Sequence, residues 1–247
     1  MPAASHPVFN QPPDARVPIW RYIDFAKYVS LLATGSLFLA RADRLGDPFE
    51  GSYTRQNLVR RRDLFARVGL PAGELARILQ HVAAHGADRR KMVFVNCWHM
   101  NEAESAAMWK LYARTEEAVA LRTNYCTLRD VLDSSCFLGR VEYVDYDAAA
   151  ISESNLFFPF LHKRRSFSHE REVRIVKTHV ESDDRHYYLS RAPQGLSVPV
   201  DLARLVERVY VAPSAKNWYR DLVESVTARY GYSFTVHQSR LDDEPLF

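Results

Sequence analysis

The chain has 247 residues, of which 47% are hydrophobic and 26% are charged, the profile of an ordinary soluble globular protein. This length is enough for one large domain with a sizeable core. The formal net charge of +3, from 33 basic and 30 acidic residues, is too balanced to predict nucleic-acid binding from net charge alone. Local basic runs at residues 60–62 and 163–165 could still contact phosphate groups.

Cysteine content and hydropathy bear on the compartment. The three cysteines, Cys97, Cys126 and Cys136, show no paired spacing, which favours a reducing compartment. No apolar run approaches the ~18 residues of a membrane span, and the first residues lack the basic and apolar regions of a signal peptide. We therefore expect a cytoplasmic protein with no membrane partner.

The first third of the chain is predicted to hold an arm, part of a sheet and a helical insertion. Residues 1–15 are rich in Pro and Ala and predict a disordered arm, which leaves residues 16–247 as one domain. Asp24 is placed to cap a helix that ends at Gly35. Residues 54–87 indicate two helices, the second ending at Gly86, that form an insertion over the sheet.

The rest of the chain mixes helices and strands. Asn101 and Glu104 stand at capping-box spacing for a helix over residues 102–113. The order of elements favours an α+β fold with a mixed, largely antiparallel central sheet over a regular βαβ repeat. The other predicted elements are strands at residues 17–22, 36–40, 92–98, 118–123, 137–146, 169–177, 187–189, 196–200, 208–211 and 233–238, and helices at 127–132, 155–167, 201–207 and 218–230.

Residues 158–178 are the stretch with the densest charge, and they suggest a site. The predicted strand at 169–177 would place Glu170, Glu172 and Arg174 on one face, because side chains alternate along a strand. Two neighbouring carboxylates repel each other unless cations face them, and such pairs recur at functional sites. The cations Lys163 and Arg164 precede them. The alternative is a solvated, salt-bridged face beside a half-buried strand.

Metal and thiol chemistry have little support. The sequence has no Cys-x-x-Cys or His-x-x-x-His spacing, so no metal is expected. Cys97, two residues before His99, lies in an apolar strand and is interpreted as an inert core thiol rather than a nucleophile. A metal-dependent nuclease remains an alternative in which Asp47 and Glu50 join Glu170 or Glu172, although Arg174 stands where such sites carry a lysine.

Four blocks resemble the bacterial and phage family known as domain of unknown function twenty-nine seventy-one. They are Trp20-Arg21-Tyr22, Asp47-Pro48-Phe49-Glu50, Cys97-Trp98 followed by Met108-Trp109-x-x-Tyr112, and Glu170-x-Glu172-x-Arg174. The resemblance covers most of the chain, and it implies a shared fold without naming an activity.

A more distant resemblance implies chemistry. Arg21 on an early strand and Glu170-x-Glu172 on a late one are similar to the Arg and Glu-x-Glu of arginine-type ADP-ribosyltransferases. By that resemblance, Glu172 would stabilise the cationic centre formed as nicotinamide leaves NAD, and Glu170 would help to activate the acceptor. Arg21 would grip dinucleotide phosphate. Those enzymes have a Ser-Thr-Ser-like middle strand, where this chain has Val-Phe-Val-Asn-Cys-Trp.

Two functions follow as alternatives. The first is an ADP-ribosyltransferase-like enzyme that uses NAD as its substrate. The second is a non-catalytic module that binds a nucleotide or nucleic acid in a defence or toxin system, with the cations at 163–165 contacting the anion. The candidate residues are Glu172 and Glu170 as catalytic groups, and Arg21, Tyr22, Lys163, Arg164, Arg174, Trp98 and His99 as binding groups.

Two structural expectations complete the interpretation. Arg21 and Glu172 should face one concave pocket. Residues 47–50 should form a fixed turn in which Pro48 sets the backbone and Phe49 is anchored in an apolar pocket. Asp47 and Glu50 would then pair with nearby cations such as Arg41 or Arg44.

Overall fold

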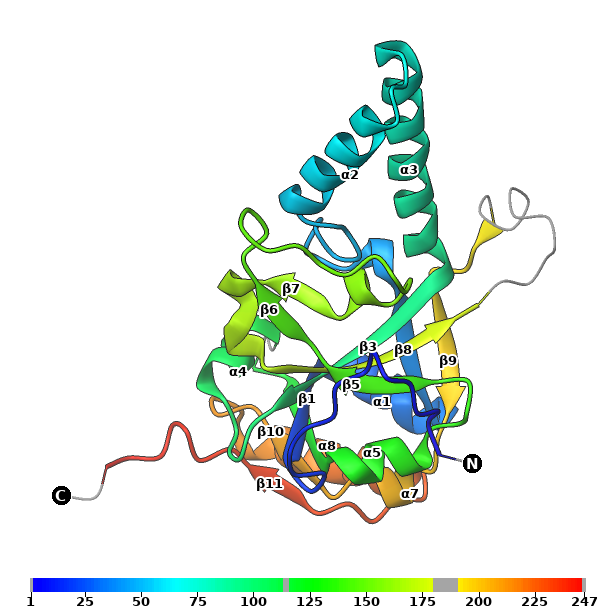
Figure 1. Cartoon of the computed structure of the whole chain (residues 1–247). Coiled ribbons are helices and arrows are strands. Elements are labelled where there is room, and N and C mark those ends of the chain that lie inside the picture. The colour runs from blue at the N-terminus through cyan, green and yellow to red at the C-terminus, as the bar shows by residue number, and fades with distance from the viewer. Residues whose placement is uncertain (1, 113–115, 180–190, 246–247) are drawn as a thin grey trace.

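The architecture was obtained as a computed structural model that describes residues 2–112, 116–179 and 191–245. A nine-stranded sheet runs in the order β11-β10-β4-β1-β3-β2-β9, with β8 paired to β3 and β5 paired to β8 (Figure 1). All pairs in this sheet are antiparallel except β10 with β11, and β6 and β7 form a separate parallel pair. The α+β prediction is therefore confirmed. The strands are β1 (Pro18–Asp24), β2 (Ser36–Arg41), β3 (Val93–Met100), β4 (Ala118–Asn124), β5 (Phe137–Arg140), β6 (Glu142–Val144), β7 (His162–Arg164), β8 (Glu172–Thr178), β9 (Gly195–Pro199), β10 (Arg208–Val211) and β11 (Val236–Gln238).

Helices cover one face of the sheet and build the main core there. The side chains of Tyr28, Leu128, Leu205 and Val223 come from four helices and pack with sheet residues in one buried apolar cluster. As predicted, Asp24 caps the first of these helices by accepting from the Lys27 amide at 2.8 Å. The helices are α1 (Phe25–Thr34), α2 (Arg55–Arg67), α3 (Ala72–Met92), α4 (Ala106–Tyr112), α5 (Tyr125–Val131), α7 (Leu202–Leu205) and α8 (Asn217–Arg229), with short 3-10 turns at Ala42–Arg44, Phe158–Phe160 and Arg165–Glu170.

The prediction of a disordered N-terminal arm is wrong for residues 2–15. The Ala4 amide donates to the Cys136 carbonyl at 2.8 Å, and the Arg140 amide donates to the Asn10 carbonyl at 2.8 Å. Phe9 is only 3% exposed and belongs to a buried aromatic cluster. Its backbone lies so close to Gly139 that a Cβ there would come within 3.0 Å of the Phe9 Cα. Composition suggested disorder because the segment is rich in Pro and Ala, but one buried aromatic ring and these hydrogen bonds hold it against the sheet.

The predicted helical insertion is present as a hairpin that projects from the body (Figure 1). It consists of α2 and α3, and Thr54 caps α2 by accepting from the Asn57 amide. Helix α3 continues past Gly86, where it was expected to end, and stops at Met92. A glycine inside a helix costs only about 1 kcal/mol, so the residues after it can carry the helix on. No described helix is long and apolar enough to cross a membrane.

Three predicted elements are corrected. The helix expected at residues 155–167 is instead a 3-10 turn, strand β7 and a second 3-10 turn, because Pro159 cannot donate a helical hydrogen bond and β7 pairs with β6. Helix α4 begins at Ala106, where the Ser105 hydroxyl rather than Asn101 accepts from a helical amide. The third is the strand at 169–177, which begins at Glu172. The expected strand at 187–189 and residue 113 lie outside the described residues.

Strand β3 is the point where the sheet splits. Along one edge it pairs with β8 from Val93 to His99. Along the other edge β1 pairs only near Met100 and β2 only near Val95. Between these contacts, residues 96–98 have no paired strand on that edge among the described residues. The two neighbouring strands diverge there, and α1 connects them.

Candidate functional site

A cavity of about 800 Å³ opens at this split. Its lining comes from β1, α1 and β2 around the gap, from the unpaired part of β3, and from the loops that follow β2 and β7. Both Arg21 and Glu172, which the sequence suggested would share a pocket, line it. Small-molecule sites have typical volumes of about 300–1,000 Å³, so the cavity is large enough for a nucleotide-sized ligand.

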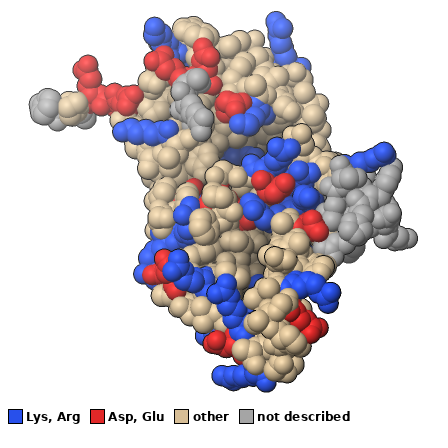
Figure 2. Space-filling model, turned by 90° about the horizontal axis from the view of Figure 1, so that it is seen from above, with Lys and Arg blue, Asp and Glu red and all other residues tan. Residues whose placement is uncertain are grey.

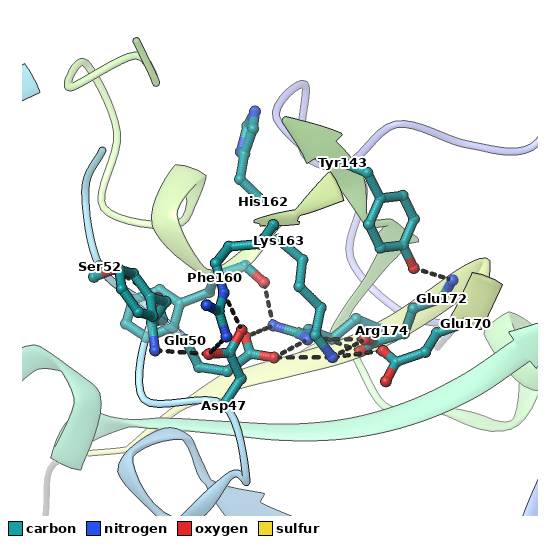
Figure 3. Close-up of polar contacts among 12 residues, drawn as sticks. Asp47, Glu50, Ser52, Tyr143, Phe160, His162, Lys163, Glu170, Glu172 and Arg174 are labelled. Carbon is teal, nitrogen blue, oxygen red and sulfur yellow. Dashed lines mark hydrogen bonds and ion pairs between the residues drawn. The ribbon is translucent and has the colours of Figure 1, made fainter. Parts of the chain in front are cut away.

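Arg174 is the centre of a buried ion cluster beside the cavity (Figure 3). Its side chain is 0% exposed. The guanidinium donates to both oxygens of Glu172, at 2.6 and 2.9 Å, and to both oxygens of Glu50, at 2.8 and 3.1 Å. It also donates to the Phe160 carbonyl at 2.7 Å, so all five of its N–H groups can be engaged. Arg174 therefore holds Glu50 and Glu172 in place and is not free to bind a ligand.

Lys163 links the same carboxylates to a third one (Figure 3). Its ammonium lies 2.5 Å from Glu170, 3.3 Å from Glu50 and 3.6 Å from Glu172. Glu170 also accepts a hydrogen bond from the Tyr112 hydroxyl at 2.9 Å. The cluster thus contains three carboxylates and two cations, so its formal charge is one unit negative.

The ion pairs outweigh the cost of burying these charges. Desolvation would raise the pKa of Glu172, but Arg174 and Lys163 hold that pKa below its ordinary value. Desolvation would likewise lower the pKa of Lys163 and of Arg174, and the facing carboxylates raise both. Burial raises the pKa of the Cys97 thiol, and the Glu172 charge raises it further. Cys97 therefore stays a neutral thiol at neutral pH, as the sequence suggested, but it lines the cavity.

The backbone explains why Glu170 joins this cluster without lying on the strand. Arg171 adopts a left-handed conformation with φ 41°, directly after the 3-10 turn Arg165–Glu170. Strand β8 then starts at Glu172. The predicted common strand face is correct for Glu172 and Arg174, whereas Glu170 reaches the cluster from the turn. Period-two alternation cannot reveal a turn of this kind, because it assumes a continuous strand.

Arg21 is a cation of a different kind. Its guanidinium donates to the Cys97 carbonyl, on the unpaired edge of β3, at 3.4 Å and lies 5.9 Å from the centre of the Trp98 ring. Within the described chain it forms no ion pair with a carboxylate. Burial without such a partner lowers the pKa of Arg21 to about 10, which still leaves it charged at neutral pH. A desolvated, unpaired guanidinium at a cavity wall is suited to an anionic ligand group.

His99 is held in one tautomer. Its Nδ1 lies 2.6 Å from the Glu170 carbonyl, which can only accept, so Nδ1 carries the proton. Nε2 is buried without a partner among the described atoms, and burial lowers the pKa of the ring. His99 lines a small adjoining cavity of about 50 Å³, together with Tyr22 and Tyr112. A neutral imidazole with a bare nitrogen therefore lies beside the carboxylates.

Tyr22 and Trp98, the two aromatic residues predicted to bind a ligand, differ in where they lie. The Tyr22 hydroxyl accepts from the Ser105 amide at 2.8 Å, and Tyr22 is among the residues that line the larger cavity. Trp98 is almost fully buried in the main core and lines the small cavity but not the larger one. A direct role of Trp98 in binding a ligand in the larger cavity is therefore not supported. Trp98 instead contacts Arg21, which lines that cavity.

The turn at residues 47–50 is present, but Phe49 is exposed, and the cations that pair with Asp47 and Glu50 are Arg164 and Arg174 instead of Arg41 or Arg44. The Glu50 amide donates to the Asp47 carbonyl at 3.1 Å, as a turn requires. Phe49 is 43% exposed, so it is not anchored in an apolar pocket. The two carboxylates are buried instead, because Asp47 pairs with Arg164 at 2.8 Å and Glu50 joins the Arg174 cluster.

The basic run at 163–165 is not an open anion-binding surface. Lys163 is buried among carboxylates, and Arg164 is paired with Asp47 and stacked near Phe49 at 4.3 Å. Only Arg165 of the three is exposed. The sequence showed three consecutive cations, but it could not show that the chain turns two of them inward toward acidic partners.

Some groups at the site had little or no signal in the sequence. The Tyr143 hydroxyl accepts from the Glu172 amide at 2.8 Å, which orients the start of β8. Lys27 and Phe38 line the cavity from α1 and β2. Tyr112 stood in the sequence as the last residue of the Met108-Trp109-x-x-Tyr112 block, but it was not among the predicted site residues.

Two further observations concern possible metal ligands and the similarity of the chain to known proteins. Among the described residues, no group of three or more His, Cys, Asp or Glu side chains is arranged to hold a metal ion. Lys163 and Arg174 lie between the three clustered carboxylates instead. In comparisons with known proteins, no protein-family model, no curated protein and no solved structure matches this chain.

Proposed function

We propose that the cavity binds NAD and that the protein cleaves the bond between nicotinamide and ribose. The observation that carries the proposal is the uneven charge around one cavity. Arg21 has no carboxylate partner in the described chain, whereas the nearby cluster has one more carboxylate than it has cations. NAD combines an anionic pyrophosphate with a cationic nicotinamide ring, so each part of the ligand meets the opposite charge.

The binding step rests on Arg21. A planar guanidinium can donate two parallel hydrogen bonds to a phosphate, and Arg21 has donors left over after its single hydrogen bond to Cys97. Lys27 and Arg164 also line the cavity, but each is paired with a carboxylate, Asp24 and Asp47 respectively, so the phosphate contact rests on Arg21. Tyr22 and Phe38 add aromatic residues to the lining. These groups are suited to a phosphate chain that carries planar rings.

The chemical step rests on the carboxylates. As the bond from ribose C1′ to the nicotinamide nitrogen breaks, its electron pair leaves with nicotinamide, and positive charge develops on the ribose. A fixed carboxylate such as Glu172 stabilises that charge in a water-poor site. A lone pair of water or of an acceptor hydroxyl then bonds to C1′, and Glu170 accepts the released proton. The products are nicotinamide, a proton, and ADP-ribose or the ADP-ribosylated acceptor.

One observation favours a second candidate, a module that binds a nucleotide without reacting. Both oxygens of Glu172 already accept hydrogen bonds from Arg174. In that function Glu172 only orients Arg174, and the cavity recognises the ligand through Arg21. The two candidates share the binding step and differ in whether nicotinamide is released.

Nicotinamide release is the test that separates them. We expect the wild type to release nicotinamide from NAD, and Glu172→Gln to lower the rate on the order of 10²-fold or more, because glutamine keeps the shape and loses the charge. Glu224→Gln on the exposed side of α8 is the matched control and should leave the rate unchanged. Calorimetric heat from NAD binding without any release of nicotinamide would establish the non-catalytic binding module. If NAD produces no heat of binding and no nicotinamide is released, both candidates are overturned.

The Arg21→Gln variant tests the binding step separately. We expect NAD affinity to fall by tenfold or more, since charged hydrogen bonds contribute about 1.5–3 kcal/mol. Thermal stability should not fall, because Arg21 forms no ion pair in the described protein. Isothermal calorimetry and thermal unfolding measure the two effects, with Arg16→Gln on the exposed surface as the control. Unchanged affinity in Arg21→Gln would remove the phosphate-binding role.

A further inference from the structure

Charge is distributed unevenly between the α2–α3 hairpin and the body. Residues 55–92 contain nine Lys or Arg and three Asp or Glu, a formal charge of +6. The whole chain carries +3, so the remaining residues carry a net charge of −3. The hairpin is also the part that projects farthest from the sheet (Figure 1). Figure 2 views the molecule from that end and shows Lys and Arg gathered near the middle of the face, with Asp and Glu between them.

A groove of about 500 Å³ lies along this hairpin. Arg77, His81, His85 and Arg89 line it from α3 at intervals of four residues, a spacing that places side chains on one side of a helix. Across the groove, Arg61 lies 4.4 Å from the centre of the Tyr53 ring, and Arg89 lies 5.5 Å from it. The groove is therefore basic along its length and contains an aromatic ring.

Most of these cations are not neutralised by the protein itself. The lining contains a single carboxylate, Glu153, which is already engaged by Arg61 at 2.8 Å and by the Asn57 amide group at 2.8 Å. No carboxylate of the described chain lies within ion-pair distance of Arg77 or Arg89 in the groove, or of Arg60 and Arg62, which lie on α2 outside its lining. This differs from residues 163–165, where two of the three cations are paired internally.

We propose that the α2–α3 hairpin is a docking surface for the phosphate backbone of a nucleic acid strand. Lys and Arg that neutralise phosphates release condensed counterions, which gives sequence-independent binding. The exposed arginines of both helices, among them Arg60, Arg62 and Arg77, supply such contacts to a linear polyanion. The docking surface lies outside the cavity, and its existence does not depend on the cleavage of NAD.

An anionic membrane is the less favoured occupant. Lipid binding by a helix requires a continuous apolar face opposite a basic one. The exposed apolar residues of α2 include Leu58, Val59 and Leu64, but the arginines at 60–62 stand between them in sequence and are distributed around the helix. Such a surface cannot enter the lipid boundary without burying arginine charge.

The test compares two triple variants that change the net charge equally. Arg60→Glu, Arg62→Glu and Arg77→Glu together remove the net charge of the hairpin, whereas Arg16→Glu, Arg208→Glu and Arg229→Glu make the same change on exposed positions of the body. Binding of a fluorescent single-stranded RNA and of a duplex DNA is measured by anisotropy between roughly 50 and 200 mM salt. Thermal unfolding checks that both variants are folded, and the corresponding Arg→Gln hairpin triple should show an intermediate effect.

We expect the hairpin triple to weaken binding by tenfold or more. The slope of log affinity against log salt should fall by about one for each phosphate that the variant no longer neutralises. The body triple should stay within about threefold of the wild type, since it changes only the long-range field. Equal weakening by both triples, no nucleic acid binding by the wild type at low salt, or tighter binding to phosphatidylserine vesicles than to either nucleic acid would each overturn the proposal.

Discussion

The Arg174 cluster and the α2–α3 hairpin use the same residue types in opposite ways. In the cluster, two cations and three carboxylates are buried and joined by short contacts. The hairpin contains nine cationic and three acidic residues. Arg60, Arg62 and Arg77 have no ionic partner in the described chain. Burial makes pairing obligatory, because an isolated charge in the interior costs several kcal/mol. At the surface, water screens the charge, so it can remain available to a ligand.

This difference shows that a run of charge in the sequence does not reveal its own use. Residues 60–62 and 163–165 look alike as basic triplets. The first triplet keeps Arg60 and Arg62 exposed on a projecting helix, while Arg61 pairs with Glu153. The second triplet sends Lys163 and Arg164 to acidic partners. Their mutational effects should therefore differ in both size and kind.

The largest effect is expected where the buried cluster is broken. Arg174→Met should destabilise the protein by roughly 3–5 kcal/mol, because it leaves Glu50 and Glu172 buried without a full partner. Urea unfolding monitored by tryptophan fluorescence measures this change. Arg229→Met on the exposed surface is the control and should stay within about 0.5 kcal/mol.

A partial recovery would identify the mechanism. If the loss comes from uncompensated charge, adding Glu172→Gln to Arg174→Met should cost less than the sum of the two single changes. A stability loss below about 1 kcal/mol for Arg174→Met would contradict the view that burial makes this pairing obligatory.

An intermediate effect is expected from acid. The pKa of Glu172 is lower in the folded protein than in the unfolded chain, so its stabilising contribution is present above the unfolded pKa, about 4.3. The contribution is lost as pH falls through the folded pKa, since the unfolded chain takes up the proton first. Each such excess proton costs up to about 1.4 kcal/mol per pH unit.

Urea titrations between neutral and acid pH check this dependence and separate the buried cluster from the hairpin. The Glu172→Gln variant should show a shallower loss of stability below about pH 4.3, whereas the hairpin Arg→Gln variants should keep the wild-type acid limb. If the free energy of unfolding falls equally steeply with acid in the wild type and in Glu172→Gln, other carboxylates dominate the acid response.

The smallest effect on stability is expected from the hairpin. Arg60→Gln with Arg62→Gln should change the free energy of unfolding by no more than about 0.5 kcal/mol, since exposed charges without partners contribute little. Removing like charges could even stabilise the hairpin slightly. A destabilisation above about 1 kcal/mol would show that these arginines hold the fold together and are not free for a partner.

Much of the fold could be predicted from local patterns. Asp24 and Gly35 delimit α1, and a continuous apolar run marked β3, which is buried on both faces, because capping and apolar runs are local features of the sequence. The errors occurred where tertiary contacts override local preference. Phe9 binds the N-terminal segment to the sheet, and Pro159 with the β6–β7 pair replaces an expected helix.

The candidate site was predicted in part. Glu172 and Arg174 share a strand face, as alternation required, and Arg21 lines the same cavity as Glu172. The burial of Glu50 beside Arg174 was not predicted, because 124 positions separate them in sequence. Nor could the exposure of Phe49 be foreseen, since the turn could place either its ring or its carboxylates inside.

The α+β class, the helical insertion and the residue types of the four motif blocks could be recognised before any coordinates were known. Those properties depend on local propensity and on the period of apolar residues, which a single chain displays directly. Which charges are paired became visible from the folded arrangement. Pairing depends on distance between segments remote in sequence: the split of β3 leaves Arg21 at a cavity wall without a carboxylate in the described chain, while the turn at Arg171 carries Glu170 to Lys163.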